Sequence, residues 1–141
     1  MNVAVIIPAY NEQLTVAEVM RQFHEQLPDA GIWVVNNAST DKTAEEARRA
    51  FRESGIKGGL LNEPRKGKSN ACRKAFREVD ADIYVMVDAD LTYPAGLVHR
   101  LIEPVAAGVA DTVIADRLSC QSYQAGKTRR FHCMGNYLVC K

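Results

Sequence analysis

The fold is decided by the stretch Ile83-Tyr84-Val85-Met86-Val87-Asp88-Ala89-Asp90. Its first five residues form an apolar, partly β-branched run, which predicts a buried strand. Asp88 and Asp90 follow where this strand ends, and ligands of open α/β sheets bind outside the carboxyl ends of the strands. Two carboxylates at this place suit Mg²⁺ or Mn²⁺, which prefer oxygen ligands and often share a site with a diphosphate.

The same residue pattern occurs a second time, as Asp80-Ala81-Asp82, just before the predicted strand. Asp82 therefore enters the strand at its amino end. We expect this copy to lie at the edge of the sheet that is remote from the ligand. The sequence thus contains its own comparison for the metal site: identical residues at opposite ends of one strand.

Apolar runs alternate with helical patterns along the rest of the chain. Two of the predicted helices begin with the spacing of a capping box, Thr15 with Glu18 and Thr43 with Glu46. This alternation predicts right-handed βαβ units, a mainly parallel sheet and the α/β fold class. The other predicted strands are residues 3–7, 32–35, 59–61 and 112–115.

Size and charge exclude some classes of protein. At 141 residues we expect one domain, and a formal net charge of +1 argues against a dedicated nucleic-acid binder. Positive charge is concentrated between Lys42 and Arg77, a stretch with eleven Lys or Arg and only four Glu. This concentration indicates either two solvated helix faces or a field that attracts a polyanionic ligand.

Cysteine spacing and hydropathy indicate the compartment. The four cysteines show no Cys-x-x-Cys spacing, so thiolate metal sites and redox sites are not expected. The first predicted strand begins almost at Met1, so no signal peptide is expected. No apolar run approaches the roughly 20 residues that span a bilayer. We therefore expect a cytoplasmic chain with no transmembrane segment, with the inner face of the membrane as an alternative location.

Polar loops follow four of the predicted strands, and a parallel sheet would bring these loops to one edge. Amides and a carboxylate could read a base and a ribose, a flexible Lys-Gly-Lys could approach phosphate near a helix N-terminus, and two aspartates could hold a metal. Together these groups predict a site for a nucleoside diphosphate. The loops are residues 8–12, 36–41, 62–68 and 88–90.

These loops resemble the motifs of the family 2 glycosyltransferases, which have the Rossmann-like GT-A fold. The likeness spans about residues 2–117, in the family's order and spacing. It implies a nucleotide-sugar-binding α/β domain at residues 1–117, followed at 118–141 by the start of an incomplete acceptor-side segment. The matching motifs are Val5-Ile6-Ile7-Pro8-Ala9-Tyr10-Asn11-Glu12, Val34-Val35-Asn36-Asn37-Ala38-Ser39-Thr40-Asp41-Lys42-Thr43, Lys66-Gly67-Lys68 and Val87-Asp88-Ala89-Asp90.

The resemblance also implies a role for particular residues. Asn36 would approach the base, and Lys68 the base or the phosphates. Asp88, followed by Ala89 of the same motif, would lie near the ribose or the metal, and Asp90 would be the principal metal ligand. Capping of the helix after Thr92 is the alternative role for the two aspartates. The wall of the nucleoside pocket would comprise Pro8, Ala9, Tyr10 and Glu12.

The chain departs from the family pattern in two respects. The family usually has an aspartate where this chain has Asn36. An amide both accepts and donates hydrogen bonds, so Asn36 could take the N3–H of uracil and donate to O4, which keeps a uridine nucleotide as the expected ligand. The second departure is that no residue matches the carboxylate that usually serves as the family's base, so the catalytic residue is unassigned.

The leading hypothesis is a metal-dependent, inverting glycosyltransferase that uses a nucleoside-diphosphate sugar, with UDP as the expected nucleotide. The acceptor, whether polyprenyl phosphate, lipid or saccharide, is undetermined. The alternative is a truncated nucleotide-binding module without turnover. A nucleotidyltransferase would need a Gly-rich loop after the first strand, and a receiver domain would need an acidic pair there. Residues 8–12 have neither, which argues against both classes. Apolar surface near residues 137–139 would also favour self-association.

Overall fold

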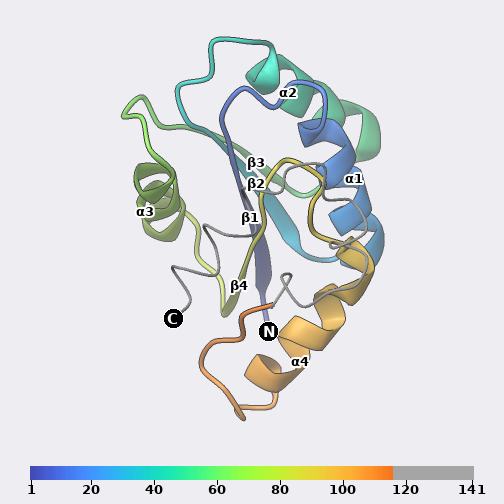
Figure 1. The fold of residues 1–141 in the computed structure, drawn as a ribbon. Helices are drawn as coiled ribbons and strands as arrows, with labels where there is room; N and C mark the ends of the chain where they lie inside the picture. Colours follow the sequence, from blue (N-terminus) through green and yellow to red (C-terminus); the bar gives the residue numbers. More distant parts are fainter. Residues whose placement is uncertain (116–141) are drawn as a thin grey trace, which may run out of the picture.

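The computed structural model describes residues 1–115, which form a four-stranded parallel sheet with helices on both faces (Figure 1). The strand order is β3-β2-β1-β4. The α/β class and the parallel sheet predicted from the sequence are therefore confirmed. The elements are β1 (Val3–Ala9), α1 (Val16–Gln26), β2 (Gly31–Asn36), α2 (Thr43–Ser54), β3 (Gly58–Asn62), α3 (Lys68–Glu78), β4 (Ile83–Met86), a 3₁₀ turn η1 (Ala95–Leu97) and α4 (Val98–Ala106).

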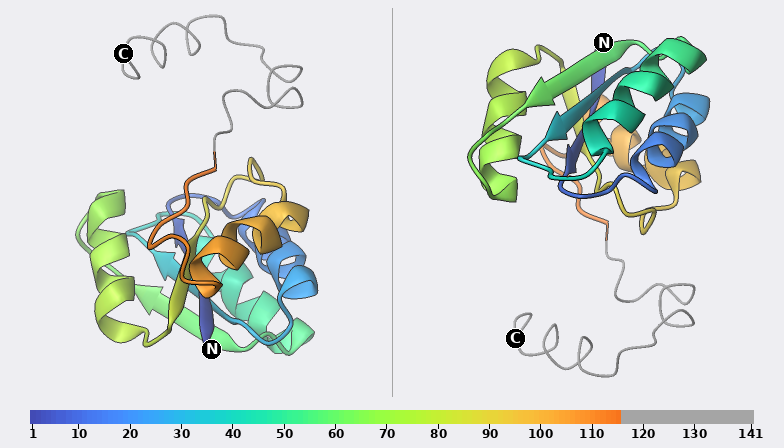
Figure 2. Two further views of the ribbon diagram at one scale, coloured as in Figure 1. Left: turned by 90° about the horizontal axis from the view of Figure 1, so that it is seen from below. Right: turned by 90° about the horizontal axis from the view of Figure 1, so that it is seen from above.

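The helices cover the two faces of the sheet unequally (Figures 1 and 2). Helices α1, α2 and α4 lie on one face and α3 lies alone on the other. The larger core cluster contains alternate residues of β1 and β2, including Val5, Ile7 and Ile32, packed with apolar residues of α1 and α2. The smaller cluster contains Ile6 and the α3 alanines. Strand β1 is thus buried from both sides, which explains its unbroken apolar sequence.

The register of the strands aligns the carboxyl ends of β1, β2 and β3. Ala9 of β1 pairs with Asn36 of β2, and Asn36 pairs in turn with Asn62 of β3. The carboxyl ends of three strands therefore lie side by side, and the loops that follow them begin at the same height.

The winding of the chain reverses between β1 and β4. From β1 the chain proceeds through β2 to β3 on one side, and α3 then returns it to β4 on the other side of β1. The crevice between diverging loops at such a reversal is where open α/β sheets bind ligands. In this chain the reversal falls between the loop after Ala9 and the loop after Met86, so a ligand is expected there.

Some details differ from the sequence predictions. Residues 112–115 form no strand, and Ile114 is 87% exposed, so this short run lacks the burial and the strand partner that would make it a fifth strand. Helix α4 continues to Ala106 and contains Pro104 within its last turn.

Neither predicted capping box forms. The Thr15 hydroxyl donates to Glu12 Oε2 at 3.0 Å, and the Glu18 carboxylate accepts from Arg21 and Gln22 in its own helix. Thr43 is the first residue of α2; its hydroxyl donates to Asp41 in the preceding loop, and its Oγ1 accepts from the Glu12 N–H in the loop after β1. Both threonines use their hydroxyl groups to fix loops, so these hydroxyls are not available to cap.

The comparison between the two Asp-Ala-Asp sequences comes out as expected. Asp82 lies at the amino end of β4, where its Oδ2 accepts from the backbone N–H of Asn2 at 2.6 Å. It is therefore at the edge of the sheet opposite to Asp88. Within residues 1–115 no helix has the length and apolar character needed to cross a membrane. The segment predicted at 118–141, and the apolar residues 137–139, lie outside the described residues.

Candidate functional site

The loops after β1 and β2 are joined by hydrogen bonds at the rim of the sheet. The Asn11 N–H donates to Ser39 Oγ at 3.1 Å, and Asn11 Oδ1 accepts from the Thr40 N–H at 2.8 Å. Asn11 makes these contacts with a backbone φ of 55°, in the left-handed region that asparagine tolerates better than most residues. These bonds fix the position of Tyr10, which is 48% exposed beside them.

A buried threonine of α2 fixes the end of the loop that follows β1. Thr43 is fully buried, its Oγ1 accepts from the Glu12 N–H at 2.8 Å, and its hydroxyl donates to Asp41 Oδ1 at 2.5 Å. Burial raises the pKa of Asp41, but the hydrogen bonds from Thr43 and Gln13 outweigh it, so the pKa is below its usual value. Asp41 therefore stays ionised as an acceptor that organises the loop.

Asn37 joins the β2 loop to the loop between β3 and α3. Its side chain is 5% exposed; Nδ2 donates to the carbonyls of Glu63 at 3.2 Å and Arg65 at 2.7 Å, while Oδ1 accepts from the Gly67 N–H at 2.8 Å. Asn37 falls within the second of the matching motifs, but the sequence predicts no role for it. The available signal was a second polar residue next to Asn36. It could not identify the partners of Asn37, because these lie 26 or more residues away in the sequence.

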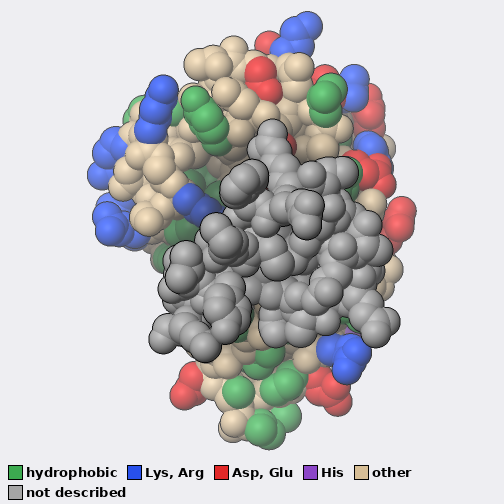
Figure 3. Space-filling model, in the orientation of Figure 1, with side chains coloured by type: hydrophobic (Ala, Val, Ile, Leu, Met, Phe, Trp, Pro, Cys, Tyr) green, Lys and Arg blue, Asp and Glu red, His purple; other side chains and the backbone are tan. Residues whose placement is uncertain are grey.

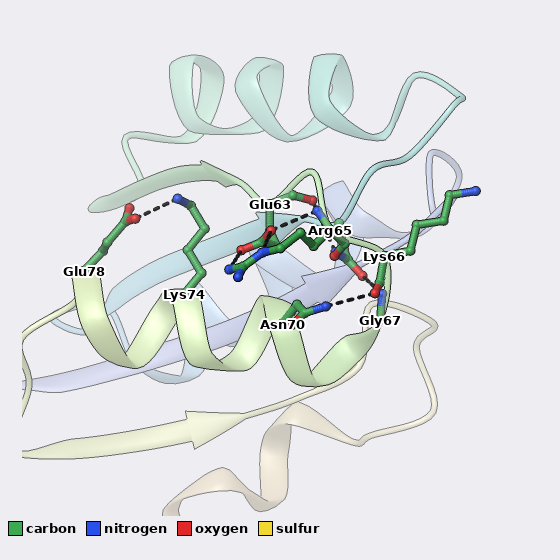
Figure 4. Close-up of polar contacts among 8 residues, drawn as sticks. Glu63, Arg65, Lys66, Gly67, Asn70, Lys74 and Glu78 are labelled. Atoms are coloured by element: carbon green, nitrogen blue, oxygen red, sulfur yellow. Dashed lines mark hydrogen bonds and ion pairs between the residues drawn. The ribbon is translucent and has the colours of Figure 1, made fainter.

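Glu63 and Arg65 give the same loop a second internal support (Figure 4). The Glu63 side chain is only 3% exposed and accepts from the Arg65 backbone N–H, Nε and Nη2 at 2.8–2.9 Å. These hydrogen bonds from Arg65 lower the pKa of Glu63 to about 2. The Lys-Gly-Lys stretch predicted to be flexible is therefore attached to a hydrogen-bonded loop, and Lys68 is already the first residue of α3.

Basic side chains from this loop and from α3 gather on one side of the molecule (Figure 3). Lys66 extends away from its own loop (Figure 4), and its Nζ lies 5.9 Å from the centroid of the Tyr10 ring, within the range of a cation–π contact. The contact links the β1 and β3 loops. Part of the positive charge is paired, as in Lys74 with Glu78 at 2.6 Å. The basic stretch thus combines solvated helix charge with cations directed at the loop rim.

The fourth loop, after β4, meets the third through an ion pair. Lys68 Nζ contacts Asp88 Oδ1. Asp90 Oδ1 accepts from the Thr92 N–H at 3.1 Å and from the Thr92 hydroxyl at 2.6 Å. Asp90 thus closes a local turn at Thr92, and neither η1 nor α4 has a side-chain cap, so the expected alternative of helix capping is not seen. Asp88 instead interacts with a residue twenty positions earlier in the chain.

Backbone strain coincides with the same rim. Among the described residues, three non-glycine residues have positive φ: Asn11 at 55°, Ala38 at 54° and Leu91 at 62°. They lie in the loops after β1, β2 and β4. Left-handed conformations of residues such as alanine and leucine cost free energy and occur preferentially at functional sites. The strained positions therefore mark the same edge of the sheet as the polar contacts.

The remaining predicted residues lie at the ends of the strands. Asn36 ends β2, where its Nδ2 donates to Asn62 Oδ1 at 3.0 Å and its Oδ1 accepts from the Ser39 N–H at 3.3 Å. Ala9 and Ala89 have buried side chains, at 1% and 2% exposed, so contact with a ligand at these positions would involve their backbone atoms. Pro8 is half-buried within β1, and the Glu12 carboxylate accepts from Thr15.

A cleft of about 960 Å³ opens beside β4, which is the last strand of the described sheet on this side. Lys68 and Asp88 line it together with apolar side chains. The β4 wall includes Met86, which is 41% exposed, and α4 contributes Leu101 and Ile102. The ion pair at the loop rim is therefore continuous with a space large enough for a small ligand.

The two aspartates fit a divalent cation that shares its coordination with a ligand. Asp88 already binds a cation, the Lys68 ammonium, and its side chain is 25% exposed. Within residues 1–115 no cluster of three or more His, Cys, Asp or Glu could hold a metal by itself. Two protein carboxylates, completed by diphosphate oxygens and water, match the way Mg²⁺ is usually bound, whereas a closed protein cage is unusual for it.

Comparison with known sequences gives one family and several relatives. The family model described as glycosyl transferase family 2 matches residues 4–137. Protein RfbJ of Shigella flexneri is 43% identical over 117 residues, which cover 82% of this chain and 85% of RfbJ. The dolichol-phosphate mannosyltransferase of Pyrococcus furiosus is 34% identical over 119 residues, which cover 83% of this chain but 33% of that protein.

Solved structures of other proteins also resemble the described fold. The mannosyltransferase PcManGT of Pyrobaculum calidifontis, in complex with GDP-Man and Mn²⁺, has a TM-score of 0.68 and 31% identity over 74% of this chain and 32% of its own. The glucosyl-3-phosphoglycerate synthase of Mycobacterium tuberculosis, in complex with Mn²⁺, UDP-Glc and phosphoglyceric acid, has a TM-score of 0.63 and 26% identity over 76% of this chain and 40% of its own. The chain thus spans about a third of the length of some of these proteins and most of RfbJ.

Proposed function

This chain belongs to glycosyl transferase family 2, and from that premise we propose that it binds a nucleoside-diphosphate sugar with Mn²⁺ or Mg²⁺. The sugar is transferred to an acceptor with inversion at the anomeric carbon. The observation that supports this proposal best is the linkage of all four loops at one edge of the sheet. Asn11 joins the first to the second, Asn37 the second to the third, and Lys68 the third to the fourth.

Each group at this edge has a chemical task in the proposal. The loop after β1 and Asn36 hold the nucleoside, with Tyr10 as one wall. Lys68 neutralises phosphate charge, and Asp88 and Asp90 hold the divalent cation. The cation, when bound, neutralises the charge that develops on the departing nucleoside diphosphate. The apolar cleft beside β4 is the proposed route by which the acceptor approaches, because Asp88 lies in its wall.

The identity of the nucleotide depends on Asn36. Its Oδ1 takes one hydrogen bond from Ser39 and its Nδ2 gives one to Asn62, so the amide retains one acceptor lone pair and one N–H. That pair of functions suits the adjacent N3–H and O4 of uracil, so UDP is the proposed nucleotide. The two solved structures named above contain GDP-Man and UDP-Glc respectively, which makes GDP the competitor to test.

The acceptor is proposed by class only. A dolichol-phosphate mannosyltransferase and a phosphoglycerate glucosyltransferase are both among the similar proteins, so a phosphorylated acceptor is the best-supported class. Polyprenyl phosphate is its lipid member, and a location at the inner face of the membrane is proposed with it. The base that would take the acceptor proton is not assigned to any described residue.

Titration calorimetry tests the nucleotide site directly. UDP and GDP are titrated into the full chain with and without Mn²⁺, and we expect UDP to bind only weakly in the absence of the metal. Asp90→Ala should abolish the metal dependence. The matched control is Asp80→Ala, which removes the same charge from the other end of β4. Equal binding of UDP with and without Mn²⁺ in the unmodified chain contradicts the proposal, and a transfer assay separates an enzyme from a module that only binds.

A further inference from the structure

We propose that Lys68 is an exchangeable counter-ion that couples metal binding to diphosphate binding. In the metal-free chain its ammonium neutralises Asp88; a divalent cation displaces it, and the freed ammonium then binds the diphosphate. The inference rests on the proposed function in one respect, since it takes Asp88 and Asp90 as the metal site. It goes further by assigning Lys68 two alternative partners and an order of events.

The first support is the geometry of the ion pair. Lys68 Nζ contacts Asp88 Oδ1, and both side chains remain accessible, at 56% exposed for Lys68 and 25% for Asp88. An accessible ion pair is weak because water screens it, so a competing cation can break it. A divalent cation interacts with a carboxylate about twice as strongly as an ammonium at the same distance, since the Coulomb energy scales with charge.

The second support is the difference between a fixed backbone and a free side chain. The loop before Lys68 is held by Asn37, which bonds Arg65 O and Gly67 N, and by the Glu63–Arg65 pair. Lys68 itself is the first residue of α3. Only the side chain of Lys68 is therefore free to change partner. Its aliphatic side chain can change rotamer while the Lys68 backbone and the loop stay in place.

The position of the Lys68 backbone favours an anion as the second partner of the side chain. Lys68 lies at the amino end of an eleven-residue helix, where unpaired N–H groups and the helix dipole favour negative charge. Lys66, two residues earlier, brings a second cation to the rim above Tyr10. A diphosphate held by the metal at Asp88 would therefore meet the ammonium that the metal has just displaced.

The exchange predicts opposite effects of one substitution on two ligands. Removing the Lys68 ammonium leaves Asp88 without its competing cation, so Mn²⁺ alone should bind Lys68→Met more tightly, by about fivefold. UDP in saturating Mn²⁺ should bind the same variant about tenfold more weakly, because its phosphate partner is lost. In Lys68→Met, Mn²⁺ should therefore increase the affinity for UDP less than it does in the unmodified chain. By linkage, UDP must increase the affinity for Mn²⁺ less by the same factor.

The test is calorimetric titration of the full chain with Mn²⁺ alone, then with UDP at saturating Mn²⁺. Lys66→Met is the matched control, since it removes the same charge from the same loop but touches Tyr10 and not Asp88. We expect it to change the Mn²⁺ affinity less than twofold. Lys68→Gln is the second variant, and circular dichroism checks that each variant is folded.

The outcomes separate this inference from the proposed function. If the unmodified chain binds Mn²⁺, Asp90→Ala abolishes that binding, and Lys68→Met and Lys68→Gln bind it no more tightly than Lys66→Met, the exchange is wrong and the metal site stands. If the unmodified chain does not bind Mn²⁺ even with UDP present, the proposed function fails first. Tighter Mn²⁺ binding together with weaker UDP binding in both Lys68 variants supports the exchange.

Discussion

Replacing Asn37 by alanine removes the side chain that fastens the β3–α3 loop to the β2 loop. The buried amide makes three hydrogen bonds, to Glu63 O at 3.2 Å, Arg65 O at 2.7 Å and from Gly67 N at 2.8 Å. The net contribution of one such bond is about 1 kcal/mol, so the three together predict a loss of about 3 kcal/mol. Entry of water would lower this figure, and an N–H left unpaired would raise it.

The loss is measured by urea denaturation and by thermal unfolding of the folded variant. For a chain of 141 residues, about 3 kcal/mol corresponds to a fall in Tm of roughly 10 °C. Asn70→Ala is the matched control: the same residue type, near the same loop, making one exposed bond to Lys66 O at 3.0 Å. We expect it to cost under about 0.5 kcal/mol.

The comparison also has a functional readout. If Asn37 positions the loop, its alanine variant should lose affinity for UDP, while Asn70→Ala should keep it. A variant of Asn37 as stable as Asn70→Ala, within about 0.5 kcal/mol, would refute the reasoning. It would mean that the loop holds its shape without the buried amide, so the Glu63–Arg65 pair would be sufficient.

Two further predictions concern stability. Because the pKa of Glu63 is about 2 when folded and 4.5 ordinarily, its ion pair with Arg65 stabilises the fold above about pH 4.5, and this contribution disappears as the pH falls towards 2. Glu63→Gln should therefore lose less stability than the unmodified chain between pH 5 and pH 2.5 in chemical denaturation; an unchanged pH profile contradicts this. Gly58→Ala should cost over about 3 kcal/mol, because its Cβ would lie 1.8 Å from Ile32 O at a φ of 122°. Gly55→Ala, at a φ of 62° with open space, should cost about 1 kcal/mol, and equal losses would disprove the steric argument.

The sequence predicted the sheet and the edge where the loops meet, because both follow from apolar runs and from the rules of βαβ winding. It did not predict how the loops are joined. Apolar periodicity reports which side chains are buried, but a buried polar residue such as Asn37 has no periodic signal. Its partners also lie in another loop. The role of Glu63 was missed for the same reason.

The wrong predictions have a related cause. A capping box is a local pattern, and Thr15 and Thr43 match it, yet both hydroxyls bond to the loop after β1 because tertiary contacts outweigh local preference. Residues 112–115 have strand-forming side chains but no partner among the described strands, so propensity alone does not make them a strand.

The reversal of winding between β1 and β4 has an evolutionary consequence. The nucleoside end of the proposed site comes from β1 and β2, which the chain winds in one direction, and the aspartates come from β4, reached by the return of α3 across the opposite face. Mutations that change which nucleotide base is recognised therefore need not disturb the aspartates. A descendant could exchange one nucleotide for another by altering the first half-site while inheriting the second intact.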